Sequence, residues 1–112
     1  MPNTARRAQR RDDNDKPLRN YLKREWIFPK PHIIILEAGQ GADWLLLSRG
    51  RLDIVEIKDP NKPPSDRTLT PDEQSLKEVC ESLGIPYHLV MTEQDVDALM
   101  ENTGTLRRLG VK

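Results

Sequence analysis

Apolar and polar residues follow two different periods along the chain, and together they predict three helices and four strands. Apolar positions recur at helical spacing in the segments 17–26, 70–83 and 92–100. Short apolar or β-branched runs, typical of strands, occupy 33–36, 45–47, 52–58 and 87–91. The order helix, three strands, helix, strand, helix predicts an α/β fold in which helices flank a mixed four-stranded sheet.

The ends of the central helix and the burial of the first strand can also be predicted. Thr70 and Glu73 have the spacing of a capping box, with Pro71 at the first helical position. Gly84 follows the last apolar position, as expected of a helix C-cap. The strand Ile33–Leu36 shows no alternation, which predicts burial on both of its faces.

A tight turn in the middle of the chain predicts where three charged side chains lie. Ser48–Arg51 reads as a turn in which Gly50 takes a positive φ. Centring a hairpin between residues 49 and 50 sets Asp43 opposite Glu56, on one face of the two strands. Lys58 lies two residues beyond Glu56, so it shares that face. We therefore expect these three side chains to converge.

Two adjacent carboxylates and a lysine can perform phosphodiester chemistry. The carboxylates repel each other, and a hard cation such as Mg²⁺ or Mn²⁺ offsets the repulsion through oxygen ligands. The ion would polarise a phosphodiester and activate a water, while Lys58 would orient or deprotonate that water or stabilise the developing charge. The alternative for Asp43, Glu56 and Lys58 is an exposed salt-bridged cluster without chemistry.

Composition adds little to this interpretation. The 112 residues suit one domain, and 18 basic against 18 acidic residues give no net charge that would indicate nucleic-acid binding. A single cysteine, Cys80, fits a reducing compartment, and no apolar run is long enough to span a membrane. We expect a cytoplasmic protein without a membrane partner, with a single domain at 17–102 between a mobile polar tail at 1–16 and a C-terminal tail at 103–112.

The residues of the proposed site resemble a known family. Asp43 followed by Glu56-Ile57-Lys58 resembles the D…ExK core of the PD-(D/E)XK nuclease superfamily. The segments 69–74 and 84–96 extend the similarity to small phage-type VRR-NUC nucleases. The resemblance implies a restriction-endonuclease-like core and a Mg²⁺- or Mn²⁺-dependent endonuclease acting on DNA. It further implies structure-directed cutting of junctions, flaps or nicks in phage or prophage DNA metabolism, a homodimer, and the host cytoplasm as location.

The resemblance also implies roles for individual residues. Asp43, Glu56 and the backbone carbonyl of Ile57 would bind the metal, and Lys58 would act on the water. Gln74 would lie beside the lysine and help order the water or the substrate. An acidic residue on the first helix often completes the site in this family. The candidates for such an additional acid are Glu25 and, at the end of the first predicted strand, Glu37.

Basic residues near the turn and in a proline-rich loop are candidate DNA contacts. The loop 59–67 has three prolines and no apolar residue, so it lies on the surface, where it could border the DNA. The candidate phosphate contacts are Lys62, Arg67, Arg49 and Arg51. His88 is expected to have a structural or surface role or to contact substrate. The first helix matches the family poorly, which leaves an alternative: a catalytically inactive protein of nuclease fold that binds nucleic acid or a protein partner.

Overall fold

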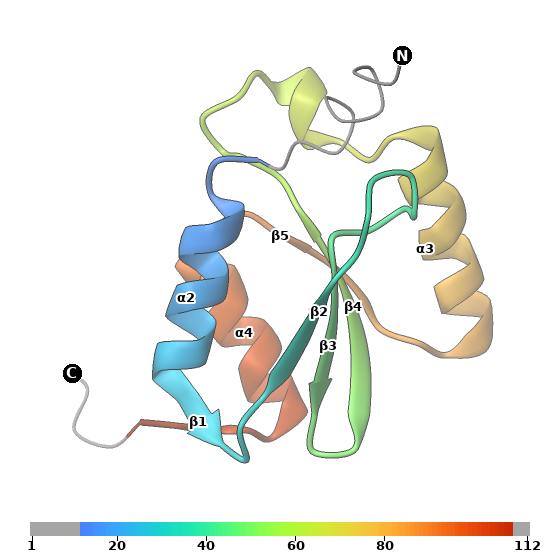
Figure 1. Cartoon of the computed structure of the whole chain (residues 1–112). Coiled ribbons are helices and arrows are strands. Elements are labelled where there is room, and N and C mark those ends of the chain that lie inside the picture. Colours follow the sequence, from blue (N-terminus) through green and yellow to red (C-terminus); the bar gives the residue numbers. More distant parts are fainter. Residues whose placement is uncertain (1–11, 109–112) are drawn as a thin grey trace.

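A four-stranded mixed sheet with helices on both faces forms the centre of the protein (Figure 1). The computed structural model describes residues 12–108. Its helices are α2 (Asp15–Glu25), the 3₁₀ helix η1 (Pro64–Arg67), α3 (Pro71–Leu83) and α4 (Glu93–Thr103). Its strands are β1 (Trp26–Phe28), β2 (His32–Ile35), β3 (Trp44–Ser48), β4 (Arg51–Ile57), β5 (Tyr87–Val90) and β6 (Leu106–Arg107). The sheet order is β2-β3-β4-β5, with only the β4–β5 pair parallel, which confirms the predicted fold class.

The two faces of the sheet are covered unequally. Helices α2 and α4 lie together on one face, and α3 lies alone on the other (Figure 1). The larger core lies against α2 and α4 and includes Trp44, Leu46, Val55, Ile57 and Val90 from the sheet. A smaller cluster lies under α3 and is built on Ala42, Ile54 and Cys80. Alternate residues of β4 therefore enter different environments.

The hairpin has the predicted register. Trp44 pairs with Val55 and Ser48 with Arg51, so the turn consists of residues 49 and 50. Arg49 has φ 53° and Gly50 has φ 73°, the pair of positive values that a two-residue hairpin turn of type I′ requires. The predicted positive φ of Gly50 is confirmed.

The ends of α3 are also as predicted. The Thr70 hydroxyl accepts from the Glu73 N–H while the Glu73 carboxylate accepts from the Thr70 N–H, which completes the capping box. Gly84 ends the helix with a left-handed φ of 75°. Strong local signals of this kind need no tertiary contact to be satisfied.

The prediction that the first strand is buried on both faces is wrong. Within residues 12–108, β2 is an edge strand that pairs only with β3. Ile34 and Ile35 are 40% and 45% exposed. Ile34 pairs with Leu45 on the α3 face, whereas Ile35 pairs with Trp44 on the face of α2 and α4. The helices therefore leave the edge of the sheet at β2 partly uncovered on both faces.

The boundaries of the folded part also differ from the sequence prediction. Helix α2 starts at Asp15 rather than at residue 17, and it ends before Trp26, which begins β1. β1 pairs with β6, so the segment 106–107 is a strand and not a tail. Tertiary contacts hold it, because the Arg108 N–H donates to the Glu25 carbonyl at 2.7 Å. The rest of the two predicted tails, 1–11 and 109–112, lies outside the described residues.

Within residues 12–108, no helix is both long and apolar enough to cross a membrane.

Candidate active site

The open end of the β3–β4 hairpin brings the predicted carboxylates together. The Asp43 N–H donates to the Val55 carbonyl at 2.8 Å, so the residue that precedes β3 still hydrogen-bonds to β4. A carboxylate oxygen of Asp43 accepts from the Ile57 N–H, also at 2.8 Å. This bond holds the Asp43 carboxylate against the backbone directly after Glu56, whose side chain is buried.

Lys58 lies between two glutamates. Its ammonium Nζ is 3.5 Å from Glu56 Oε2 and 2.8 Å from Glu73 Oε1. The side chains of Lys58, Glu56 and Glu73 are 9%, 6% and 16% exposed, so water screens these charges only weakly. The structure thus brings together Asp43, Glu56 and Lys58, as the register predicts, and adds Glu73 from α3.

Burial and mutual repulsion shift the ionisation of this cluster. Burial raises the pKa of Glu56 to about 9, and the nearby Asp43 and Glu73 carboxylates add to the rise against the opposing effect of Lys58. Burial alone would lower the pKa of Lys58, but its bonds to Glu73 and Glu56 outweigh that effect and raise it. Lys58 is therefore held as an ammonium. Glu56 lacks enough positive charge around it to be a stable carboxylate.

The donor set suits an open cation site. Asp43 and Glu56 supply oxygen ligands, and a hard dication would supply the positive charge that Glu56 needs to ionise. Among residues 12–108, no group of three or more Asp, Glu, His or Cys side chains is arranged to hold a metal. Mg²⁺ commonly binds through one or two carboxylates, with water and phosphate oxygens completing the shell. The residues present fit that arrangement and do not form a closed protein cage.

Glu25 is not part of this cluster, which corrects one of the two expected additional acids. The Asn14 side chain donates to the Lys58 carbonyl at 3.0 Å, so the start of α2 lies beside the site. Glu25 is at the other end of this eleven-residue helix, about 15 Å farther along its axis. There its carboxylate lies 2.8 Å from Arg24 and 3.7 Å from Arg107.

Glu37 is exposed in the loop that follows β2. Its neighbour Leu36 donates its N–H to the Asp43 carbonyl at 2.8 Å. Glu37 therefore lies at the same end of the sheet as Asp43, and its participation in the site stays a prediction.

The α3 residue that contacts Lys58 is Glu73 and not Gln74. Gln74 is exposed, and its amide donates to the Glu78 carboxylate at 3.1 Å. Sequence reasoning assigned Glu73 only to the capping box, a role that it has. The capping box fixed the conformation of Glu73, but only the packing of α3 on the sheet shows that Lys58 lies within its reach.

The basic residues expected to bind DNA fall into two groups. Lys62 and Arg67 belong to the loop that follows Lys58. Lys62 is 44% exposed and forms an ion pair with Asp12. The Arg67 Nε atom is buried and has no hydrogen-bond partner within the described residues.

Arg49 and Arg51 lie at the closed end of the hairpin, away from Lys58. The seven residues of β4 separate the two ends by about 20 Å. The Arg51 guanidinium donates to both carboxylate oxygens of Asp53, at 2.8 and 2.9 Å, and to the Asn102 carbonyl at 2.8 Å. These bonds give Arg51 a structural role, and the structure does not bring either arginine to the site.

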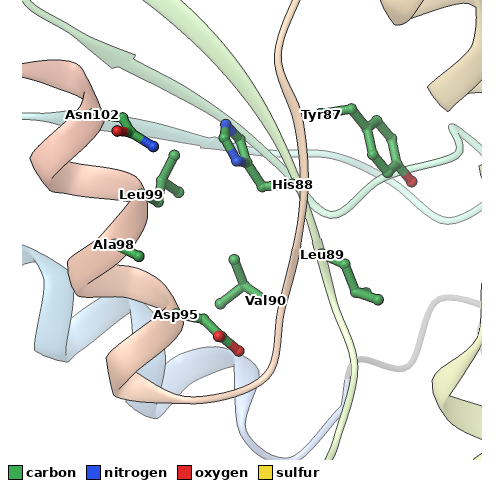
Figure 2. A pocket seen from close by; sticks show the side chains of 8 residues that line it. All are labelled: Tyr87, His88, Leu89, Val90, Asp95, Ala98, Leu99 and Asn102. Atoms are coloured by element: carbon green, nitrogen blue, oxygen red, sulfur yellow. The ribbon is translucent and has the colours of Figure 1, made fainter.

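A pocket of about 300 Å³ lies between β5 and α4 (Figure 2). Lys58 pairs with Glu73 of α3, which covers the opposite face of the sheet from α4 (Figure 1). His88 and Val90 point to the α4 side of β5, whereas Tyr87 and Leu89 point to the other side (Figure 2). His88 Nε2 lies 2.7 Å from the buried Asp53 carboxylate, which supports a structural role for this histidine. The pocket is separate from the carboxylate cluster.

Comparison with known proteins gives one clear similarity, in three dimensions. No family model and no curated protein sequence matches this chain. A solved structure described as a VRR_NUC domain is similar, with a TM-score of 0.59 and 24% sequence identity. The similarity covers 80% of this chain and 97% of that one. It confirms the predicted restriction-endonuclease-like fold.

Proposed function

We propose that this protein is a metal-dependent nuclease that hydrolyses phosphodiester bonds in DNA. The observation that carries the proposal is the convergence of Asp43, Glu56 and Lys58 at the open end of one hairpin. The structural similarity to a VRR_NUC domain supports a role for these three side chains in phosphodiester hydrolysis. The alternative of a solvated surface cluster fits poorly with side chains of Glu56 and Lys58 that are less than a tenth exposed.

In this proposal, some residues bind the metal ion and Lys58 stabilises the phosphate. Asp43, Glu56 and the Ile57 carbonyl would hold Mg²⁺ or Mn²⁺, which when bound polarises the phosphodiester and acidifies a water. The Ile57 N–H orients the Asp43 carboxylate for this task. The Lys58 ammonium would stabilise the charge that develops on the phosphate and donate to the attacking water's oxygen. Its raised pKa disfavours a role as general base.

The proline-rich loop supplies the proposed contacts to the DNA backbone. Arg67 has a buried, unpartnered Nε among residues 12–108, and Lys62 is an exposed cation of the same loop. Phosphate contacts position DNA without reading its sequence, which supports cleavage directed by junctions, flaps or nicks. Gln74 would contact substrate only after its amide leaves Glu78, and both side chains are exposed. The sequence resemblance is the support for a homodimer and for a setting in phage or prophage DNA metabolism.

Cleavage assays on structured DNA test the proposal. The full-length chain should cut at least one of a four-way junction, a flap, a nicked duplex or a single strand with Mg²⁺ or Mn²⁺, and EDTA should stop it. We expect Lys58→Ala to lower kcat by about 100-fold or more, because one preorganised donor to the transition state is lost. Lys77→Ala removes a partly exposed lysine of α3 that pairs with Glu81, and it serves as the matched control. Equal cleavage by Lys58→Ala and wild type would remove the proposed role.

The second candidate function is binding without cleavage. It is favoured by the position of Glu25 and by the absence, within 12–108, of a group of three ligand side chains arranged around one point. A thermal-shift titration with Mn²⁺ separates the two functions, since an ion that binds only the folded state raises the melting temperature. The nuclease proposal expects a rise that Asp43→Asn abolishes, with Ca²⁺ as a non-productive control. Binding of DNA with no Mn²⁺-dependent rise would support the second function.

A further inference from the structure

A single oxygen of Glu73 accepts from the start of α3 and from the lysine of the site. Glu73 Oε1 lies 2.8 Å from the Thr70 N–H nitrogen and 2.8 Å from Lys58 Nζ. The Thr70 hydroxyl accepts in return from the Glu73 N–H at 3.3 Å. The capping box therefore fixes the direction of the Glu73 carboxylate independently of Lys58.

Hydrogen bonds fix the backbone of Lys58, so a neighbouring side chain can orient only its side chain and ammonium. The Lys58 N–H donates to the Val90 carbonyl at 3.1 Å, and its own carbonyl accepts from the Asn14 side chain at 3.0 Å. A lysine side chain still rotates about the bonds of its four-carbon stem after its backbone is fixed. Of its two carboxylate partners, Glu73 is closer than Glu56, at 2.8 against 3.5 Å.

We infer that Glu73 is a positioning residue that holds the Lys58 ammonium beside Glu56, an inference that rests on the proposed nuclease function. Glu73 acts through Lys58 and does not itself contact the reacting phosphate. The capping box of α3 thereby orients the Lys58 ammonium, which pairs with both Glu56 and Glu73. A helix start that serves only to satisfy backbone N–H groups would not require a carboxylate at this distance from Lys58.

The variant Glu73→Gln separates the cap from the contact with lysine. Glutamine also serves at this position of a capping box, so α3 keeps its start, but the charge facing Lys58 is lost. Asp72→Asn is the matched control, because Asp72 is an exposed carboxylate of the same helical turn. Circular dichroism melting of both variants checks that each one folds.

Amine labelling measures the position of Lys58 without any nuclease activity. The full-length protein is treated with a small acylating reagent in EDTA, and modification at Lys58 and Lys77 is read by peptide mass spectrometry. We expect labelling of Lys58 to rise about fivefold in Glu73→Gln, since the charge-assisted bond that shields it is gone. Labelling of Lys77, which pairs with Glu81 on α3, should not change, nor should Lys58 labelling in Asp72→Asn.

Cleavage kinetics supply the second readout. Glu73→Gln should lower kcat about tenfold with KM for DNA nearly unchanged, as expected when an interaction specific to the transition state is lost. Asp72→Asn should cut like wild type. Unchanged labelling of Lys58 in Glu73→Gln, or changed labelling with a wild-type kcat, would overturn the inference. If the wild-type chain cuts no DNA, the proposed function fails, and the labelling contrast still decides whether Glu73 holds Lys58.

Discussion

At the scale of single residues, β4 carries two buried carboxylates in opposite electrostatic states. Asp53 is fully buried on the α4 side, where Arg51 and His88 donate to it. Burial alone would raise the pKa of Asp53, but these two donors outweigh it and lower the pKa. Glu56, on the α3 side, has its pKa raised to about 9 by burial and by neighbouring carboxylates. A satisfied carboxylate of the first kind is structural, and an unsatisfied one of the second kind is typical of functional sites.

The structural role of Asp53 predicts a pH-dependent stability. Replacing Asp53 by Asn should cost about 2–4 kcal/mol of unfolding free energy near pH 7, because a buried charge pair loses one partner. The folded pKa of Asp53 lies below its unfolded value, so its stabilisation is present above about pH 4 and is lost as the pH falls through the folded pKa. Urea unfolding of wild type and variant between pH 3 and 7 measures the difference.

The control for this prediction is the surface ion pair between the partly exposed Lys77 and the exposed Glu81. Glu81→Gln should cost less than about 0.5 kcal/mol at any pH, since surface pairs contribute little. A penalty for Asp53→Asn that stays constant down to pH 3 would show that charge is not the cause.

At the scale of elements, a glycine lets α3 pack directly on the chain that leads into β3. Gly41 has φ 89°, and a Cβ built on it would lie 3.0 Å from Leu76 Cβ and 3.2 Å from the Asp72 carbonyl oxygen. The carbonyl of Gly41 also accepts from the Tyr87 hydroxyl at 2.8 Å. This close approach sets the distance between the first turns of α3 and Asp43, and hence between Glu73 and the carboxylate pair.

A pair of glycine variants tests this contact. Gly39→Ala should cost about 1–2 kcal/mol, because φ is 87° but no atom lies within 4 Å of the new Cβ. Gly41→Ala has the same backbone strain and adds the clash with Leu76, for a further cost of about 1–3 kcal/mol. Chemical denaturation measures both values. Equal costs for the two variants would show that the packing of α3 adjusts freely.

At the scale of the whole molecule, the C-terminal strand joins three elements on the α2 and α4 side. The Arg107 guanidinium lies 5.1 Å from the centroid of the Trp26 ring and donates to the Tyr21 hydroxyl at 3.2 Å. It also lies within 4 Å of the carboxylates of Asp97 in α4 and Glu25 in α2. One side chain therefore connects α2, β1 and α4 to the segment that follows α4.

Neighbouring arginines allow a matched test of this connection. Arg107→Ala should lower the melting temperature by several degrees, because it leaves the buried Glu25 and the Asp97 carboxylate without that cation. Arg108→Ala keeps the backbone N–H that bonds to the Glu25 carbonyl and should lower it less. Differential scanning calorimetry gives both values, and a larger effect of Arg108→Ala would contradict the assignment.

The sequence by itself determined the features that depend on local chemistry. The Arg49–Gly50 turn fixed the hairpin register, and that register placed Asp43 near Glu56, because cross-strand pairing follows from turn length alone. Thr70 and Glu73 determined where α3 begins, because both partners of a capping box lie within four residues.

Tertiary packing decided the features that depend on which elements pack against each other. β2 is exposed although its isoleucines suggest burial, because hydrophobicity does not say which part of a sheet a helix covers. Glu73 rather than Gln74 reaches Lys58, because neighbouring helix residues point about 100° apart and only docking decides which one faces the site. The β1–β6 pair forms from segments almost 80 residues apart, a contact that no local pattern specifies.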